Sequence, residues 1–253
     1  MNFSVNALCL FGKTPLDHAF AIMKEHGYST FEHWRIDKSE ADSIAAAMQK
    51  HEITLSAICT NYFTLNDESC HDAYEDGLLH ALEVAGKLHC PALITQVGQD
   101  TGEDRKIQHQ AIVKGLLRVK PHLEKANVTL LVEPLNNVKD HKGYYLTSSQ
   151  EGFEIMREVN SPNIKLLYDI YHQLHMGENV LAIIADHLDL IGHFHIAGFP
   201  ARDDRLFETY DYRPLLTFLQ EQKVKVAVGL ELFPSSIEKA EAVLDALRPY
   251  LHD

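Results

Sequence analysis

The chain has 253 residues, of which 45% are hydrophobic, and carries a formal net charge of −13 at pH 7. This length is enough to bury a large core, either as two small domains or as one barrel. The acidic balance argues against binding to nucleic acid or to an anionic membrane surface, because both require a basic footprint. A small anionic substrate is not excluded, because an arginine at the binding site can outweigh the repulsion from more distant negative charges.

No linker rich in Gly, Ser or Pro, no block of like charge and no low-complexity run interrupts the sequence, so we expect one domain over residues 1–253. The four cysteines are scattered without a CxxC pair, which is typical of reduced thiols in a cytoplasmic protein. The first residues lack the basic start and long apolar run of a signal peptide. No stretch approaches the roughly 18 apolar residues of a membrane span. The expected location is therefore the cytoplasm.

Read by periodicity, the chain alternates strand-like and helix-like stretches from end to end. Strands are expected at 3–10, 28–34, 53–59, 91–97, 127–133, 164–169, 190–196 and 224–232. Helices are expected at 15–26, 38–50, 68–88, 104–126, 148–160, within 173–188, at 212–222 and at 235–251. Eight such units in this length match a (β/α)8 TIM barrel, whose active sites lie at the C-terminal ends of the strands.

An open doubly wound sheet is the competing architecture. It usually carries a glycine-rich phosphate turn after its first strand, and the stretch LFGKTP at 10–15 matches that turn poorly. Neither GxGxxG nor GxxxxGK[ST] occurs in the sequence. The sequence therefore favours a single α/β TIM barrel, and no organic cofactor is expected.

Four apolar strands in the second half of the chain each end on a residue that could bind a metal. The segments LLVEP, KLLYD, GHFH and VGLE supply Glu133, Asp169, His195 and Glu231. Successive strand residues alternate between faces, so if these four point inward, so do Leu131, Leu167, His193 and Gly229. The residues between them then point outward, namely Val132, Tyr168, Phe194 and Leu230. The spacings of 36, 26 and 36 residues leave room for a helix between strands, so the four ends would converge on one mouth.

Charges that point into a barrel are costly unless they are paired or bound to a metal. Three carboxylates gathered around one imidazole repel one another unless a cation lies between them. A donor set rich in oxygen, with one nitrogen and no thiolate, suits Mn²⁺ or Mg²⁺, while Co²⁺ or Zn²⁺ could replace them. Four protein ligands would leave two octahedral positions for adjacent oxygens of a substrate such as an α-hydroxy ketone.

A cation at this mouth would polarise the substrate carbonyl and stabilise the enediolate that forms when a neighbouring carbon loses its proton. Glu133 and Glu231 lie three strands apart around the expected barrel and could flank the substrate. One could remove a proton while the other returns it.

The segments VEPLNN, YDIYHQ, GHFHIAGFPAR and GLELFP resemble the hydroxypyruvate isomerase branch of the xylose isomerase-like barrels. That superfamily also holds ketose 3-epimerases and the endonuclease IV fold. The resemblance covers nearly the whole chain and is strongest over 128–234. It implies a metal site whose ligands are Glu133, Asp169, His195 and Glu231. The two glutamates of this set would also be the acid/base pair. The resemblance further implies substrate contacts from His172 and Arg202.

Further residues could reach the mouth. Glu32 ends the second expected strand and Asn61 follows the third, so both are candidates for substrate binding. Gln96 and His71 are weaker candidates. His193 lies one layer deeper than His195, and we interpret it as a core or supporting group rather than a ligand.

Two departures from the isomerase pattern affect the choice of substrate. The isomerase branch usually carries glutamine where this chain has His195, whereas the epimerases carry histidine. The stretch ARDDRLFETYDY at 201–212 also lacks the Glu-Pro and the glycine of the isomerase loop. The reaction class is therefore better supported than the substrate.

The leading hypothesis is a divalent-metal-dependent isomerase of a small hydroxy-oxo acid, with hydroxypyruvate and tartronate semialdehyde as the pair that the resemblance implies. A ketose 3-epimerase is the main alternative, and a polyol dehydratase would use the same chemistry. An endonuclease IV-like phosphodiesterase would need more histidine ligands and a basic groove. A sugar-binding module without activity is the remaining alternative, and a homo-oligomer is left open.

Overall fold

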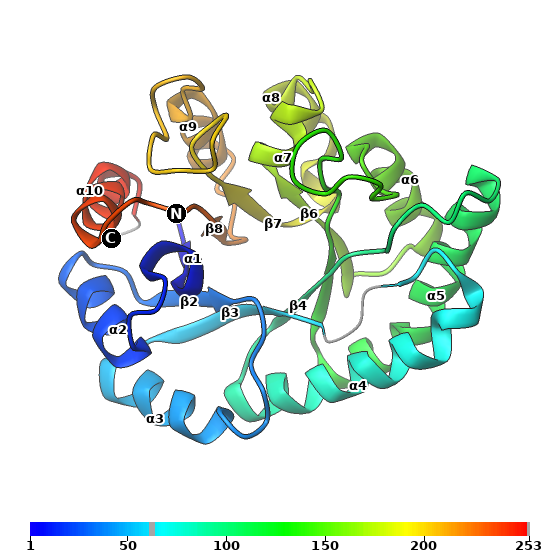
Figure 1. Ribbon diagram of the computed structural model, residues 1–253, viewed down its shortest axis with the longest axis horizontal. Helices are drawn as coiled ribbons and strands as arrows, with labels where there is room; N and C mark the ends of the chain where they lie inside the picture. The colour runs from blue at the N-terminus through cyan, green and yellow to red at the C-terminus, as the bar shows by residue number, and fades with distance from the viewer. Residues whose placement is uncertain (61–63, 252–253) are drawn as a thin grey trace.

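The computed structural model describes residues 1–60 and 64–251. Eight parallel strands form a closed barrel in chain order, with the helices in a ring around it (Figure 1). Strands β1 and β8 pair through Phe3 and Val228, which closes the barrel. The strands are β1 (Phe3–Asn6), β2 (Thr30–His33), β3 (Thr54–Cys59), β4 (Ala92–Thr95), β5 (Thr129–Val132), β6 (Ile164–Asp169), β7 (Ile191–Ile196) and β8 (Val228–Leu230). The expected TIM barrel is therefore confirmed.

Helices fill the connections between successive strands and cover the outside of the barrel (Figure 1). They are α1 (Ala7–Phe11), α2 (Leu16–Glu25), α3 (Ala41–His51), α4 (His71–Leu88), α5 (Arg105–Ala126), α6 (Ser149–Val159), α7 (Ile170–His175), α8 (Val180–His187), α9 (Arg213–Glu221) and α10 (Ile237–Leu247). Short 3₁₀ turns add η1 (Glu68–Cys70), η2 (Leu188–Leu190) and η3 (Arg248–Tyr250). Within the described residues, none of the helices is both long and apolar enough to cross a bilayer.

The structure differs from the expected elements after the first and the sixth strand, and a capping side chain explains each of these two differences. The strand expected at 3–10 ends at Asn6, whose side-chain oxygen accepts the backbone N–H of Cys9 at 3.1 Å and so starts α1. The helix expected within 173–188 is present as α8, and a further helix, α7, was missed because it begins directly after β6. There the carboxylate of Asp169 accepts the backbone N–H of His172 at 3.2 Å. The last strand also pairs over a shorter range than expected.

The alternation of side chains along the strands divides the core into two parts. Val132, Tyr168, Phe194 and Leu230 belong to the large cluster between the strands and the helices. A separate small cluster fills the inside of the barrel and contains Ala57, Ile94, Leu131 and Leu167. The inward faces predicted for Leu131 and Leu167, and the outward faces predicted for the four residues of the large cluster, are therefore confirmed. The inner cluster closes the barrel below its C-terminal mouth, so polar groups above it face a cavity that ends on apolar side chains.

Replacing Leu131 by alanine should test this inner cluster. We expect the free energy of unfolding to fall by about 2–5 kcal/mol, because the barrel interior cannot collapse around the lost methyl groups. The matched control is Leu117→Ala, since Leu117 on α5 is 44% exposed. Its effect should stay within about 0.5 kcal/mol. Urea unfolding of both variants measures the difference, and equal losses would contradict the inward placement of Leu131.

Candidate metal centre and active site

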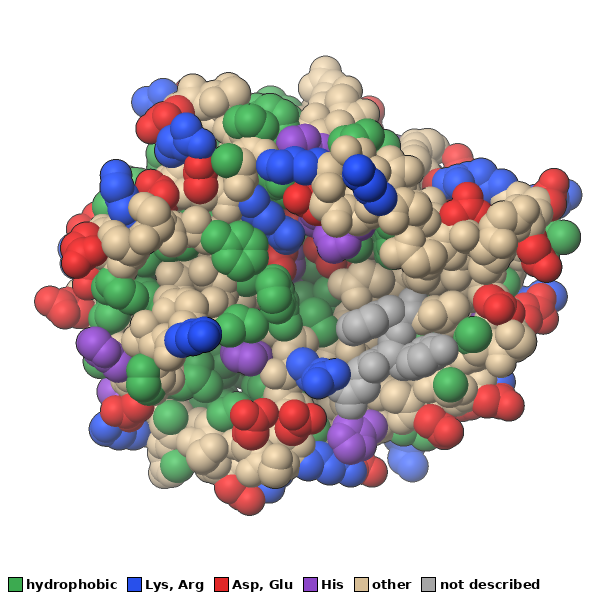
Figure 2. All heavy atoms as spheres, viewed as in Figure 1, with side chains coloured by type: hydrophobic (Ala, Val, Ile, Leu, Met, Phe, Trp, Pro, Cys, Tyr) green, Lys and Arg blue, Asp and Glu red, His purple; other side chains and the backbone are tan. Residues whose placement is uncertain are grey.

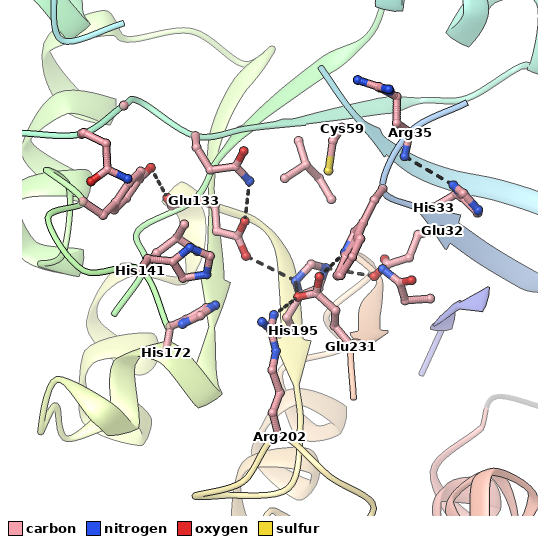
Figure 3. A pocket seen from close by; sticks show the side chains of 18 of the residues that line it. Glu32, His33, Arg35, Cys59, Glu133, His141, His172, His195, Arg202 and Glu231 are labelled. Carbon is pink, nitrogen blue, oxygen red and sulfur yellow. Dashed lines mark hydrogen bonds and ion pairs between the residues drawn. The ribbon is translucent and has the colours of Figure 1, made fainter. Parts of the chain in front are cut away.

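The structure brings the four strand-end side chains together at the mouth of the barrel. Ligand atoms of Glu133, Asp169, His195 and Glu231 all lie within 4.8 Å of one another, and all four residues are buried. Glu133 directly follows β5 and Glu231 directly follows β8, whereas Asp169 and His195 pair with each other in the ladder between β6 and β7. Figure 3 shows Glu133, His195 and Glu231 pointing toward one another.

The imidazole of His195 lies between the carboxylates. Its Nδ1 atom is 3.0 Å from Oε2 of Glu231 and 3.5 Å from Oε1 of Glu133. Burial lowers the pKa of this imidazole, but the carboxylates of Glu32 and Glu231 outweigh burial and hold the pKa well above its ordinary value. The cluster therefore attracts positive charge. Three carboxylates and one imidazole nitrogen at these distances are a suitable donor set for a divalent cation such as Mn²⁺ or Mg²⁺.

Asp169 uses its two oxygens for different purposes. Oδ1 accepts the backbone N–H of His172 and so caps α7. Oδ2 lies 3.9 Å from Nδ1 of His195 and 3.8 Å from Nη2 of Arg202. One side chain thus fixes the start of the helix after β6 and supplies an oxygen to the cluster.

Arg202 turns toward the carboxylates from the loop after β7. Its Nη2 donates to Oε2 of Glu231 at 2.5 Å, and its guanidinium lies over the ring of Tyr171 at 5.3 Å. The backbone of Arg202 is left-handed, with φ of 59°, and its N–H donates to the carbonyl of Gly198 at 2.7 Å. Its buried Nε has no hydrogen-bond partner within the described part of the chain. The predicted substrate contact from Arg202 therefore has an unused donor at the site.

The two glutamates have different surroundings. Oε1 of Glu231 accepts from the indole Nε1 of Trp34 at 2.5 Å, and the charge of Arg202 faces its other oxygen. Burial raises the pKa of Glu231, but Arg202 and His195 outweigh it and hold the pKa below the usual range. Glu133 accepts a weaker neutral contact from the amide of Gln96, at 3.2 Å. Glu231 is therefore the more strongly held carboxylate of the two.

His172 is fully buried, and its neighbours fix which nitrogen carries the hydrogen. The backbone N–H of Asn136 and its side-chain amide lie 3.3 Å and 2.6 Å from Nδ1, so Nδ1 is the acceptor. Burial lowers the pKa of His172 to about 3, so the ring is neutral and Nε2 holds the hydrogen. Nε2 lies 3.5 Å from Oδ2 of Asp169 but has no hydrogen-bond partner among the described residues. The predicted substrate contact from His172 therefore has a donor ready at the cavity wall.

The remaining candidates lie at different depths. Glu32 lines the cavity but lies deep, only 1% exposed, with its two oxygens next to His193 and His195. His71 lies on α4 with Nε2 3.0 Å from the carbonyl of Leu65, outside the cavity wall. Asn61 lies outside the described residues.

Sequence reasoning missed Trp34 and Asn136. Both act through another side chain, and neither an indole nor an amide is the kind of side chain that indicated the metal ligands. Trp34 ends the expected strand at 28–34, and an indole at a strand end is more often a packing residue. Asn136 lies within VEPLNN, where the chain gives no sign that its amide reaches His172.

A cavity of about 600 Å³ opens above the cluster. Its wall combines charged and polar groups with apolar ones. Besides the residues described above, it includes the polar side chains Arg35 and His141 and the apolar or aromatic side chains Trp34, Ile94, Leu135 and Tyr144. Figure 2 shows acidic, basic and histidine side chains gathered around the hollow at the centre of this face. The arrangement could hold a small polar substrate against the cluster, with neutral and cationic donors around it.

The chain matches a family model and is similar in sequence to proteins named as isomerases. The family model described as Xylose isomerase-like TIM barrel matches residues 20–250. A hydroxypyruvate isomerase of Escherichia coli K12 is 26% identical over 260 residues, covering 99% of each chain. A 2-oxo-tetronate isomerase of Cupriavidus necator is 33% identical over 125 residues, covering 49% of this chain and 46% of that one.

Solved structures show the same fold. A protein from Brucella melitensis, described as an AP endonuclease of family 2, superimposes with a TM-score of 0.90 at 24% identity, covering 99% of each chain. The IOLI protein, whose crystal structure contains a zinc atom, superimposes with a TM-score of 0.80 at 20% identity, covering 100% of each chain. At these identities the likeness concerns the fold alone.

The single tryptophan of the chain reports on this site, because its indole contacts Glu231. We expect Mn²⁺ to quench Trp34 fluorescence with a saturable curve, since a paramagnetic ion in the cluster would lie close to the indole. Asp169→Asn should weaken the apparent affinity by at least about tenfold, while an asparagine can still cap α7. Asp42→Asn is the control for binding to the acidic surface, since the Asp42 side chain is 86% exposed. Identical curves for the two variants would contradict a metal site at Asp169.

Proposed function

Because this chain belongs to the xylose isomerase-like TIM barrel family, we propose that it is a divalent-metal-dependent isomerase of a small hydroxy-oxo acid. Hydroxypyruvate, converted to tartronate semialdehyde, is the first candidate, since a hydroxypyruvate isomerase matches along 99% of both chains. The observation that carries the proposal is the buried cluster at the barrel mouth, with one glutamate on each side of His195.

Glu133, Asp169, His195 and Glu231 would hold the cation. When bound, it would polarise the substrate carbonyl and offset the negative charge that develops on oxygen as a carbon loses its proton. The zinc atom in the structure of the IOLI protein supports a metal in this fold. The oxygen-rich donor set of this chain favours Mn²⁺ or Mg²⁺ over zinc.

The proposed reaction removes one proton from C3 and adds one proton to C2, and proton exchange with solvent then restores the two glutamates. Glu231 would take the proton from C3 of hydroxypyruvate, because Arg202 and Trp34 hold its carboxylate ionised and in place. Glu133, on the other side of His195, would deliver a proton to C2. The hydrogen of the C3 hydroxyl passes to the C2 oxygen, so the product is an isomer of the substrate and no oxidant or reductant is consumed.

The unused donors of the site fit a hydroxy-oxo acid. Nε of Arg202 is buried, lacks a hydrogen-bond partner among the described residues, and would bind the substrate carboxylate. Nε2–H of His172 would donate to a substrate oxygen. An endonuclease activity, as in the description of the Brucella protein, is less well supported for this chain, because the net charge of −13 opposes a nucleic-acid substrate.

A longer substrate is the second candidate. The cavity of about 600 Å³ exceeds what a three-carbon acid requires, and histidine at position 195 agrees with the epimerase pattern. A four-carbon oxo acid would keep the role of Arg202, in line with the 2-oxo-tetronate isomerase relative. A ketose would leave the Nε donor of Arg202 without a carboxylate.

Proton exchange in D₂O tests the proposed function directly. With Mg²⁺, we expect the C3 signal of hydroxypyruvate to decay in proton NMR spectra and tartronate semialdehyde to appear. Glu231→Gln should slow both changes by about 10²–10⁴-fold, because the amide cannot accept the proton. Glu221→Gln, on the exposed end of α9, is the matched control and should react as the wild type does.

Three outcomes separate the candidates. Exchange with 2-oxo-tetronate or a ketose, but not with hydroxypyruvate, would replace the substrate and keep the reaction class. Full activity of Glu231→Gln would remove this residue from the proton transfer. Wild-type protein that exchanges no proton of any of the three substrates with Mg²⁺ or Mn²⁺ would contradict the proposed isomerase.

A further inference from the structure

Glu32 and His193 form a buried pair on the side of His195 that faces away from the other carboxylates. Nε2 of His193 lies 2.9 Å from Oε2 of Glu32, and both residues are buried. The His195 ring therefore bridges two groups of carboxylates. Its Nδ1 faces Glu231 and Glu133, and its Nε2 faces Glu32 (Figure 3).

Two buried polar atoms at this contact are unsatisfied. Oε1 of Glu32 and Nε2 of His195 each lack a hydrogen-bond partner in the part of the chain that the structure describes. They lie only 3.0 Å apart, so a small rotation of either group would let one donate to the other. Leaving both atoms unpaired is unfavourable, because each has lost its hydrogen bonds to water without gaining a replacement. Both atoms are therefore satisfied only when Nε2 of His195 carries a hydrogen and donates it to Oε1 of Glu32.

We propose that Glu32 is the positioning residue for His195: its Oε1 accepts the Nε2 hydrogen, so that Nδ1 is left bare and directed at the divalent cation. The inference rests on the metal site of the proposed function. A histidine that binds a metal through one ring nitrogen carries its hydrogen on the other, and a carboxylate acceptor there fixes both the tautomer and the ring orientation. His193 holds the second oxygen of Glu32 and so fixes the carboxylate in turn.

The neighbouring strand leaves space for this contact. A Cβ atom at Gly229 on β8 would lie 2.5 Å from Cδ2 of His195 and 2.7 Å from Oε1 of Glu32. Any side chain at this position would push the two groups apart. The backbone of Gly229 itself needs no unusual angle, so its lack of a side chain is explained by the contact between Glu32 and His195.

A second cation among Glu32, His193 and His195 is the rival explanation, since their ligand atoms also lie within 4.8 Å of one another. The hydrogen bond between His193 and Glu32 already occupies one ligand atom of each residue. The observations therefore favour one cation, at Nδ1 of His195, with Glu32 as its support.

Mn²⁺ binding to the whole protein tests the inference without an activity assay. The free ion is followed by EPR for the wild type, Glu32→Gln and Glu178→Gln. We expect one site in the wild type and a loss of affinity of about 10–100-fold in Glu32→Gln. Glu178 is the matched control, because it also accepts partly buried hydrogen bonds, from Tyr168 and Ser149, but lies outside the cavity. Its glutamine variant should keep the wild-type affinity even if its melting temperature falls.

The outcomes distinguish this inference from the function on which it rests. A wild type that binds no Mn²⁺ would overturn the proposed metal site and the inference with it. A wild type that binds one ion, with equal affinity in Glu32→Gln, would overturn the inference alone. Two ions in the wild type would establish the rival site and overturn it as well.

A measurement on the wild type keeps the inference testable if Glu32→Gln fails to fold. Imidazole ¹⁵N NMR spectra with Mg²⁺ report the tautomer of His195, which is assigned from the signal that His195→Gln lacks. The Nε2–H tautomer in the Mg²⁺-bound protein is expected. The Nδ1–H tautomer, or a spectrum that Mg²⁺ leaves unchanged, would overturn the inference.

Discussion

Four buried carboxylates share the mouth of this barrel, and their mutual repulsion is the constraint on which the site depends. Glu32, Glu133, Asp169 and Glu231 all surround His195, which lies within 4 Å of each. Buried charges of one sign are unfavourable unless cations and hydrogen-bond donors oppose them. Arg202 and the indole of Trp34 supply part of that compensation at Glu231. A divalent cation among the same oxygens would supply the rest, so charge balance and proposed catalysis require the same group.

The barrel positions these charges through its strand ends. Adjacent parallel strands set Asp169 beside His195 and His195 beside Gly229. Three neighbouring positions thus supply two of the proposed ligands and one residue without a side chain. Asp169 also caps α7, which places His172 on the cavity wall. The side chain that caps α7 and those proposed to bind or support the cation are thus tied to the same few backbone positions. A change at one of them is expected to affect both stability and ligand binding.

The sequence predicted the barrel and the four strand-end residues because both depend on local regularity. Alternating strands show which side chains point inward, and Glu133, Asp169, His195 and Glu231 all end such strands. The contacts of Trp34 and Asn136 could not be predicted, because they join residues far apart in the chain through side-chain geometry. The short helix α1 was missed for another reason: its apolar residues also suit a strand, and only the Asn6 cap decides between them.

The most direct test of the account is a crystal structure of the protein soaked in Mn²⁺, with anomalous differences measured at the manganese edge. One strong peak, in contact with Glu133, Asp169, Glu231 and Nδ1 of His195, is the predicted result. Glu32 should then lie within hydrogen-bond distance of Nε2 of His195 and make no contact with the ion. A peak between Glu32 and His193, or no peak at the barrel mouth under saturating Mn²⁺, would contradict the account.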